Sequence, residues 1–355
     1  MSDHRTTEFA NLLPRDFRVG FVIPQQALRE TVKRVFGKTS GRRPSIVLTP
    51  YDVANADGRF DLLIVDEAHR LEQPGNHGTQ NKRYDDSGRA VFGPGGESTT
   101  MLDWIRAKSV SQVFLSDVGQ AIRPVDLPPE ALERLRETAT ETHVLTSQLR
   151  VRAGDRYVDY VRELLTGEAT ERAEDVLNPE YDFRMFDDAQ AMYDEILARD
   201  AEAGLSRMLA GYAWDWPADT RKDPNAVHVT AGRLALPWNR TDKDWANSAT
   251  ALEEVGCIHT IQGYDLNYAG VIIGGDLRAS TGSATGGEGR VYVDWASYRD
   301  PRKERKSAKR GVVHSDEELL EDIVNIYSVL MTRGTYLYVV DPALREYLRQ
   351  FVPRA

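Results

Sequence analysis

The sequence predicts an α/β protein whose sheets are mostly parallel and covered by helices. Short apolar runs alternate with stretches that carry apolar residues at helical spacing, as is typical of such sheets. The chain has 355 residues, of which 41% are hydrophobic, so it can bury a substantial core. At roughly 100–200 residues per domain, this length favours two domains. We therefore expect two α/β domains, residues 1–140 and 141–355.

The first domain is predicted from short apolar strands with helices between them. The strand candidates are residues 19–23, 45–48, 62–66 and 112–116, and the helix candidates are residues 25–36 and 100–108. Both helix candidates carry apolar residues at helical spacing. Residues 72–98 interrupt the pattern with Gly, Asn and charged residues, and we expect an exposed loop there.

The second domain shows the same alternation after a helical stretch at residues 129–138. We expect strands at 143–146, 183–186, 207–212, 255–259, 270–274 and 337–340, and helices at 155–165 and 316–331. A loop insertion is expected at about 278–312, and it contains the basic run RKERKSAKR. That run is either a solvated insertion or a contact to a phosphate backbone.

Charge and cysteine content exclude several classes of protein. The 55 acidic and 45 basic residues give a net charge of −10, so any contact with nucleic acid must use a local patch. Cys257 is the single cysteine, which excludes an internal disulfide and a cysteine zinc site and favours a reducing compartment. No apolar run approaches the roughly 20 residues of a membrane span. We therefore expect a cytoplasmic protein without a membrane partner.

Two adjacent carboxylates follow the apolar run at residues 62–65. That run places Asp66 at the carboxyl end of a parallel strand, where α/β sheets bind ligands. Asp66 can hold Mg²⁺ through water, and Glu67 can polarise the water that attacks a γ-phosphate. An acidic turn that closes a buried strand is the alternative, but it does not require the Glu-Ala-His-Arg sequence found here. The segment therefore predicts ATP and Mg²⁺ as cofactors.

Five segments carry a resemblance to a known family. They are FDLLIVDEAHRL with its DEAH motif, VFLSDVGQAIRP, LTSQLRVRAGDRYVDYV, IHTIQGYDLNYAGVIIG and NIYSVLMTRGTYLYVVDPALREYL. From about Phe17 to the C-terminus, the chain resembles the DUF2075 family of bacterial DNA/RNA helicase-like proteins, which are related to Schlafen-type and superfamily 1 helicases. The resemblance implies two tandem RecA-like domains of the P-loop NTPase type and an ATP-dependent motor or translocase on DNA or RNA, with single strands as the expected partner.

The resemblance also implies roles for particular residues. Asp66 and Glu67 match motif II as the catalytic pair, with Asp66 as the metal ligand. Gln120 matches the motif III glutamine that senses the γ-phosphate. Arg150 matches the motif IV arginine, whose guanidinium suits phosphate oxygens. Arg333, in motif VI, would act as an arginine finger.

Motif V matches residues 259–265. The resemblance implies that Gln262, Gly263 and Asp265 contact nucleotide and that Thr260 contacts nucleic acid. A glycine allows close backbone approach to a ligand, and hydroxyl and amide groups can bond phosphate. A turn in the core is the alternative interpretation.

Aromatic residues gather near motif V in the sequence. Superfamily 1 motors stack bases on such rings, and Tyr264 and Trp238 are our candidates for nucleic-acid contact. The cluster also includes Trp214, Trp216 and Tyr268. Each of these rings has a core position as its alternative role.

The sequence departs from the family in two places. It contains no GxxxxGK[ST] phosphate loop (Walker A), because the similar Gly37-Lys38-Thr39 has Val32 where glycine is required and follows a helix. In motif VI, Thr335 and Tyr336 follow directly after residues 332–334, and the second arginine that relatives carry at this point is missing. We therefore expect the first domain to be incomplete at its N-terminus. Three explanations stay open: a truncated or mis-started product, a motor that takes its phosphate loop from another protein chain, or a non-hydrolysing nucleic-acid-binding or scaffold subunit.

Overall fold

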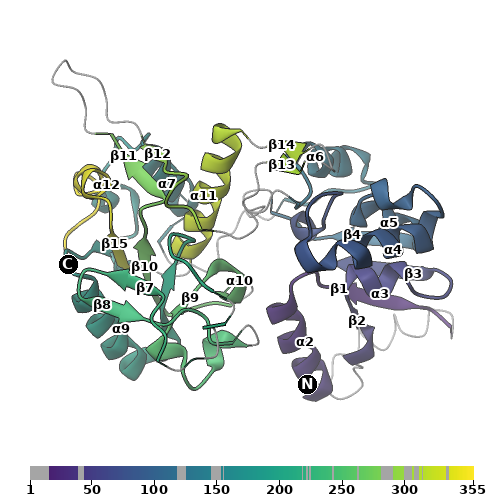
Figure 1. Ribbon diagram of the computed structural model, residues 1–355, viewed down its shortest axis with the longest axis horizontal. Coiled ribbons are helices and arrows are strands. Elements are labelled where there is room, and N and C mark those ends of the chain that lie inside the picture. The colour runs from purple at the N-terminus through teal and green to yellow at the C-terminus, as the bar shows by residue number, and fades with distance from the viewer. Residues whose placement is uncertain are drawn as a thin grey trace. The chain divides into compact units, whose positions relative to one another are not determined.

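The chain forms two compact units, which are described separately. The computed structural model describes residues 16–38, 44–117, 125–144, 153–154, 156–217, 219–220, 223, 225–241, 244–261, 264–280, 291–299, 306–307, 312–313, 315–332 and 336–355. Unit 1 comprises residues 1–118 and 125–133, and unit 2 comprises residues 119–124 and 134–355 (Figure 1). The division falls within helix α6 (Pro129–Thr138).

A four-stranded parallel sheet forms the centre of unit 1, with strand order β2-β1-β3-β4. The strands are β1 (Val19–Val22), β2 (Val47–Leu48), β3 (Phe60–Val65) and β4 (Ser109–Phe114). The four predicted strands are confirmed, with ends that differ by a few residues. Because the strands are parallel, their carboxyl ends lie along one edge of the sheet, and Asp66 follows β3 at that edge.

The two faces of this sheet differ in burial. Registered neighbours on parallel strands point to the same face, and β1 pairs with β3 through Val19↔Leu62, Gly20↔Leu63, Phe21↔Ile64 and Val22↔Val65. Gly20, Val22, Leu63 and Val65 are buried, whereas Val19, Phe21, Leu62 and Ile64 are half-buried. One face is therefore closed to solvent, and the other is covered only in part.

Two short helices of unit 1 begin at well-defined caps. Both α3 (Pro50–Ala54) and α5 (Met101–Ala107) start with a capping box, in which a threonine hydroxyl and an aspartate carboxylate each accept a backbone N–H. The expected helix at residues 25–36 is confirmed as α2 (Gln26–Lys38), and the one at 100–108 is confirmed as α5.

Helix α4 (Asn81–Phe92) corrects the prediction of an exposed loop at residues 72–98. Tyr84 anchors the helix, since its buried ring lies 4.8 Å from that of Trp104. Gly88 contacts the backbone of Gly96 so closely that a Cβ built there would lie 2.2 Å from the Gly96 carbonyl oxygen. The prediction failed because this helix packs through one tyrosine and small residues, without the apolar stripe that identifies most helices.

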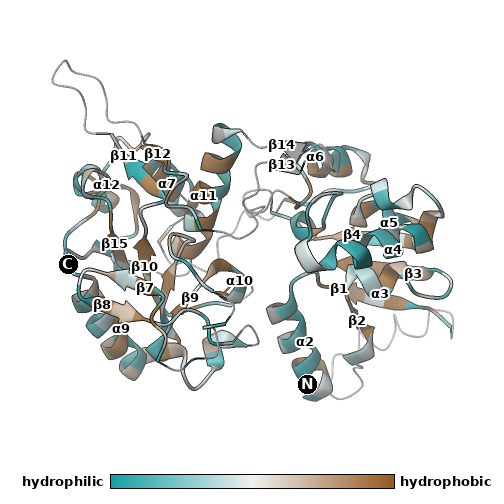
Figure 2. Ribbon diagram, viewed as in Figure 1, coloured by the Kyte–Doolittle hydropathy of each residue, from teal (hydrophilic) through white to brown (hydrophobic). Residues whose placement is uncertain are grey.

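Unit 2 contains a five-stranded parallel sheet with strand order β5-β15-β10-β6-β9. Its strands are β5 (Arg184–Met185), β6 (Ser206–Ala210), β9 (Val255–Gly256), β10 (Tyr268–Ile273) and β15 (Tyr336–Val339). Figure 2 shows β10 as a strongly hydrophobic strand, and five of its six residues are buried. Such continuous burial is typical of a parallel strand with both faces covered.

Helices and small hairpins complete unit 2. The predicted helix at 316–331 is confirmed with those bounds as α11 (Asp316–Met331), and the helix at 155–165 as α7 (Tyr157–Thr166). The further helices are α8 (Ala173–Val176), α9 (Ala189–Ala203), α10 (Ile258–Ile261) and α12 (Pro342–Leu348). The antiparallel pairs are β7 (Val229–Ala231) with β8 (Leu234–Leu236), β11 (Leu277–Ala279) with β12 (Val291–Val293), and β13 (Lys306–Ser307) with β14 (Val312–Val313).

Two strand predictions in unit 2 require correction. The strand expected at 255–259 ends at Gly256, and α10 begins two residues later. Residues 143–144 are not in a strand, and the rest of that predicted strand lies outside the described residues. Within the expected insertion at 278–312, Ala279 and Val291 are buried by the β11–β12 pairing, so its ends belong to the core.

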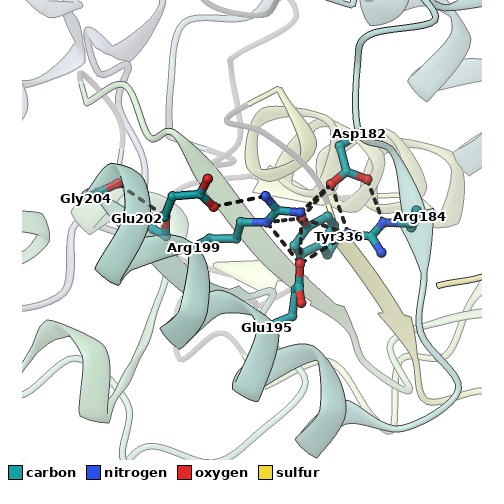
Figure 3. A network of polar contacts seen from close by, with 8 residues as sticks. Asp182, Arg184, Glu195, Arg199, Glu202, Gly204 and Tyr336 are labelled. Carbon is teal, nitrogen blue, oxygen red and sulfur yellow. Dashed lines mark hydrogen bonds and ion pairs between the residues drawn. The ribbon is translucent and has the colours of Figure 1, made fainter.

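A polar network joins α9 to the amino ends of two strands in unit 2 (Figure 3). The buried Tyr336, at the start of β15, donates its hydroxyl hydrogen to Asp182 at 2.7 Å. Its oxygen accepts from Arg184 and Arg199, each at 3.0 Å, and Arg199 also pairs with Glu195 along α9. Because the ion pairs are partly exposed, each stabilises the fold by less than about 1 kcal/mol. The hydroxyl of the buried Tyr336 is the group that these charged side chains share.

The described chain is thus a mixed α/β protein with mostly parallel sheets, an architecture compatible with a P-loop-like fold. In the described part, no helix has the length and apolar character needed to cross a membrane.

Candidate nucleotide site and related proteins

Backbone hydrogen bonds from both neighbouring strands hold the predicted carboxylates in place. The Asp66 N–H donates to the carbonyl of Val22, the last residue of β1, at 3.0 Å. The Ala68 N–H donates to the Leu115 carbonyl at 2.8 Å, and the Leu115 N–H donates to the Val65 carbonyl at 2.9 Å, just past the end of β4. Asp66 and Glu67 therefore lie at the carboxyl edge of the sheet, as the sequence predicted.

Glu67 adopts a left-handed backbone conformation, with φ 52° and ψ 46°. This region is uncommon for a residue with a side chain and costs of order 1 kcal/mol or more. The conformation turns the chain directly after the strand, and the Glu67 N–H donates to Asp66 Oδ1 at 3.1 Å. The turn thus places two consecutive carboxylates at the end of one strand.

The His69 ring lies against the Glu67 carboxylate. The Asp117 N–H donates to His69 Nδ1 at 3.1 Å, so in the neutral ring the hydrogen resides on Nε2. That nitrogen lies 3.0 Å from Glu67 Oε2, and both side chains are largely shielded from water. A buried imidazole fixed from one side can hold a carboxylate in one orientation. The sequence contained His69 within the DEAH motif, but its contact with Asp117 depends on the fold.

A buried ion pair anchors the chain that follows. Arg70 Nη1 lies 3.2 Å from Asp126 Oδ2, and both side chains are buried. The Leu127 N–H also donates to the Leu71 carbonyl at 2.8 Å. Removing one partner of such a pair is costly, because the other charge stays buried and unpaired. The segment after the carboxylates is therefore tied to residues more than fifty positions away.

The donors at this edge suit a magnesium ion. Mg²⁺ typically uses one or two carboxylates together with water and substrate phosphates, and Asp66 provides a half-buried carboxylate at the strand end. Among the described residues, no group of three or more His, Cys, Asp or Glu side chains could form a complete protein-only metal site. Asp66 is thus a donor of the kind that Mg²⁺ shares with a phosphate ligand.

Two predicted nucleic-acid contacts lie in the core of unit 2. Trp238 is 1% exposed, and the rings of Tyr212, Trp214 and Trp216 lie 5.6–6.4 Å from its ring. Thr260 is also buried, and its hydroxyl donates to Asn239 or the Cys257 carbonyl, each at 2.9 Å. These predictions require correction, because neither side chain presents a surface to a base or phosphate in this structure. Proximity to motif V in the sequence could not separate core aromatics from exposed ones.

The remaining predicted residues have different positions. Tyr264 is half-buried, and its hydroxyl donates to Asp244 at 2.8 Å. Asp265 is exposed. The other predicted residues lie outside the described ones: Gln120, Arg150, Gln262, Gly263 and Arg333. Their roles stay predictions.

A buried carboxylate that the sequence did not single out lies beyond the carboxyl end of β10. Tyr327, on α11, donates to Asp276 Oδ1 at 2.6 Å and accepts from the Gly274 N–H at 2.9 Å. Burial raises the pKa of the Asp276 carboxyl to about 6, against the Tyr327 hydrogen bond and two backbone N–H groups, which lower it. Gly211 leaves room for this contact, since a Cβ there would lie 2.5 Å from the tyrosine hydroxyl oxygen. The hydrogen bonds of the Tyr327 hydroxyl thus link the end of β10 to α11.

Mostly parallel sheets with paired acidic residues at a strand end belong to the mixed α/β class and are compatible with a P-loop-like fold. The comparison with family models is specific: residues 15–341 match Schlafen group 3, DNA/RNA helicase domain. The chain therefore belongs to this family. The chain is also 30% identical over 227 residues to the uncharacterized protein YPL245W of Saccharomyces cerevisiae. The aligned region covers 58% of this chain and 47% of the yeast protein. The chain thus spans about half the length of this curated relative.

Proposed function

We propose that the chain is the core of an ATP- and Mg²⁺-dependent motor or translocase on DNA or RNA, with single strands as the preferred partner. The observation that carries the proposal is the Asp66–Glu67 pair at the carboxyl edge of a parallel sheet, with the His69 ring 3.0 Å from the Glu67 carboxylate. The membership of a helicase domain family supports nucleic acid as the partner.

The residues of this edge have separate roles in the proposed reaction. Asp66 would hold Mg²⁺, which when bound neutralises charge on the nucleotide phosphates. Glu67 would orient the attacking water and accept its proton. His69 positions Glu67 and excludes water from one side of its carboxylate. Arg333 stays the proposed arginine finger, and Gln120 and Arg150 the proposed γ-phosphate contacts.

The reaction needs a phosphate loop that these 355 residues do not contain. The loop provides most of the contacts to the phosphates, through its backbone N–H groups and lysine. Without it, nucleotide affinity should be very low, however well Asp66 and Glu67 are placed. We propose that another polypeptide segment supplies the loop.

A second candidate function follows from the lack of a phosphate loop in these residues. A chain that binds no nucleotide could serve as a nucleic-acid-binding or scaffold subunit that kept the helicase fold. The two functions differ in nucleotide binding once a segment with a phosphate loop is added, since only the motor should then bind ATP.

The test measures Mg²⁺-dependent ATP hydrolysis with single-stranded DNA or RNA present. The chain by itself should show negligible turnover. The chain with a phosphate-loop segment should hydrolyse ATP, and Glu67→Gln should lower the rate by at least a hundredfold while nucleotide binding persists. Robust turnover by the chain alone that Glu67→Gln abolishes would contradict the need for an added loop. Nucleic-acid binding without any nucleotide binding would favour the scaffold.

A further inference from the structure

His228, next to the β7–β8 hairpin of unit 2, has a hydrogen-bond partner at each ring nitrogen. The Trp238 N–H donates to His228 Nδ1 at 3.1 Å, and His228 Nε2 lies 3.0 Å from the Thr220 hydroxyl oxygen. A backbone N–H can only donate, so in the neutral ring the hydrogen resides on Nε2. That hydrogen can be donated to Thr220, whose own hydroxyl hydrogen goes to the Pro217 carbonyl at 3.0 Å. The contacts thus fit the neutral ring, with Nδ1 as an acceptor.

The Trp238 N–H belongs to a short segment that pairs with β9, the edge strand of the five-stranded sheet. The Val255 N–H donates to the Pro237 carbonyl at 2.9 Å, and the Asn239 N–H donates to the Val255 carbonyl at 3.0 Å. Trp238 is 1% exposed, and a buried N–H that loses its acceptor is strongly unfavourable. The bond to His228 therefore stabilises this segment on β9.

The same segment holds the start of motif V. Asn239 is buried and has a left-handed backbone, with φ 36°. Its amide oxygen accepts from the Cys257 N–H at 3.2 Å and can accept from the Thr260 hydroxyl at 2.9 Å. Cys257 directly follows β9, and Thr260 lies on α10. The bonds of Asn239 therefore help to keep both residues buried.

We propose that His228 is a pH-sensitive latch on this segment: protonation of Nδ1 breaks the bond to Trp238 and releases the segment from β9, which exposes Cys257 and Thr260. The added proton occupies the acceptor position, so two N–H groups then face each other at hydrogen-bond distance. Such an arrangement is repulsive and leaves the buried N–H without its acceptor. The latch does not depend on the proposed function, since nucleotide and nucleic acid take no part in it.

The direction of the pH effect follows from the surroundings of the ring. Burial lowers the pKa of His228 below its usual value of 6.5, and the charge of Asp223 opposes this shift. The stability that the neutral ring contributes is therefore present above about pH 6.5 and is lost as pH falls through the lowered pKa of the folded chain. A titratable neighbour on α10 is His259, whose ring lies 5.8 Å from that of Tyr212, which in turn lies 5.6 Å from that of Trp238.

The experiment measures the reaction of Cys257 with dithiodipyridine, a disulfide that labels thiols at acidic and neutral pH. Cys257 is the single cysteine of the full chain and is 4% exposed, so its labelling reports opening of this segment. Each rate is divided by that of the urea-unfolded chain at the same pH, which removes the titration of the thiol itself. We expect about a tenfold loss of protection from pH 7.5 to pH 5.0. The rate should not depend on low urea concentrations, because the opening is local.

A loss of protection below twofold overturns the latch. A rate at the lower pH that rises steeply with urea also overturns it, because the whole chain then unfolds.

Substitutions test whether the proton acts at His228. His228→Asn keeps an acceptor near the place of Nδ1 and cannot titrate, so protection should stay high at both pH values. His228→Phe keeps a ring and removes the acceptor, so protection should be low at both. The matched controls are His259→Asn, near the cysteine, and His143→Asn, where the histidine side chain is 76% exposed; both should keep the pH dependence. If His228→Asn keeps the pH dependence, or His259→Asn abolishes it, the proton acts elsewhere and the inference is wrong.

Discussion

The contact between Tyr327 and Asp276 predicts a stability difference that depends on pH. The variant Tyr327→Phe keeps the buried ring against Gly211 and removes the hydroxyl that donates to the carboxylate. A hydrogen bond to a charged group contributes about 1.5–3 kcal/mol, and one between neutral groups about 0.5–1.5 kcal/mol. The cost of the substitution therefore depends on whether Asp276 is charged.

The direction follows from the pKa of Asp276. Burial raises it from 3.8 to about 6 in the folded protein, so its contribution to stability is fully present below about pH 4 and is lost as pH rises through about 6. A shift of roughly two units corresponds to about 3 kcal/mol. Tyr327→Phe removes a bond that lowers this pKa, so the variant should lose more stability at pH 7.5 than at pH 4. We expect a loss of about 1 kcal/mol at pH 4 and about 2–3 kcal/mol at pH 7.5.

Urea unfolding at a series of pH values measures this difference. Facing Asp276 are Tyr327 from α11 and Asp294 from the segment after β12, and Arg278 pairs with Asp294 at 2.7 Å. Tyr193→Phe is the control, because the Tyr193 hydroxyl donates to the neutral Leu252 carbonyl at 2.9 Å, and its cost should not vary with pH. A Tyr327→Phe cost that is equal at pH 4 and pH 7.5 would refute the charged contact.

Three further predictions concern packing, binding and the anchored turn. Gly88→Ala should destabilise the chain by about 1–3 kcal/mol, since its Cβ meets the Gly96 carbonyl, whereas Gly37→Ala, with only ordinary contacts in α2, should be neutral or stabilising in the same denaturation assay. Tyr264→Ala should weaken single-strand binding by about 1–3 kcal/mol in a fluorescence titration if the ring stacks on a base, and an unchanged affinity would remove it as a contact. Arg70→Ala should cost about 3–5 kcal/mol of stability, because its carboxylate partner stays buried; a loss below 1 kcal/mol would contradict that burial.

The regular part of the fold was predictable because its signals are local. The run LLIV at residues 62–65 is apolar throughout, as is typical of a buried parallel strand, and β3 includes it. The helix α11 was predicted with its correct bounds because apolar residues recur at helical spacing. The structure adds a capping box of Ser315 and Glu318 at its start. Helix α4 was missed because its packing uses Gly88 and Tyr84, and no local pattern reports a contact between two backbones.

The candidate site was likewise predictable only where its signals are local. Asp66 and Glu67 could be placed at a strand end from adjacent residues alone. The contact between Glu67 and His69 could not be predicted, because His69 is held by the backbone N–H of Asp117, which is distant in the sequence. Trp238 was assigned to nucleic acid because aromatic rings serve both cores and stacking surfaces, and only burial distinguishes them.

The order of the acidic strand end comes from the sheet itself. The backbone hydrogen bonds that fix the turn after β3 come from residues at the ends of β1, β3 and β4, all within unit 1, so the backbone that carries Asp66 and Glu67 needs no nucleotide to be in position. Under the proposed function, nucleotide affinity should therefore depend on the contacts to the phosphates and not on an ordering of these two carboxylates by the ligand.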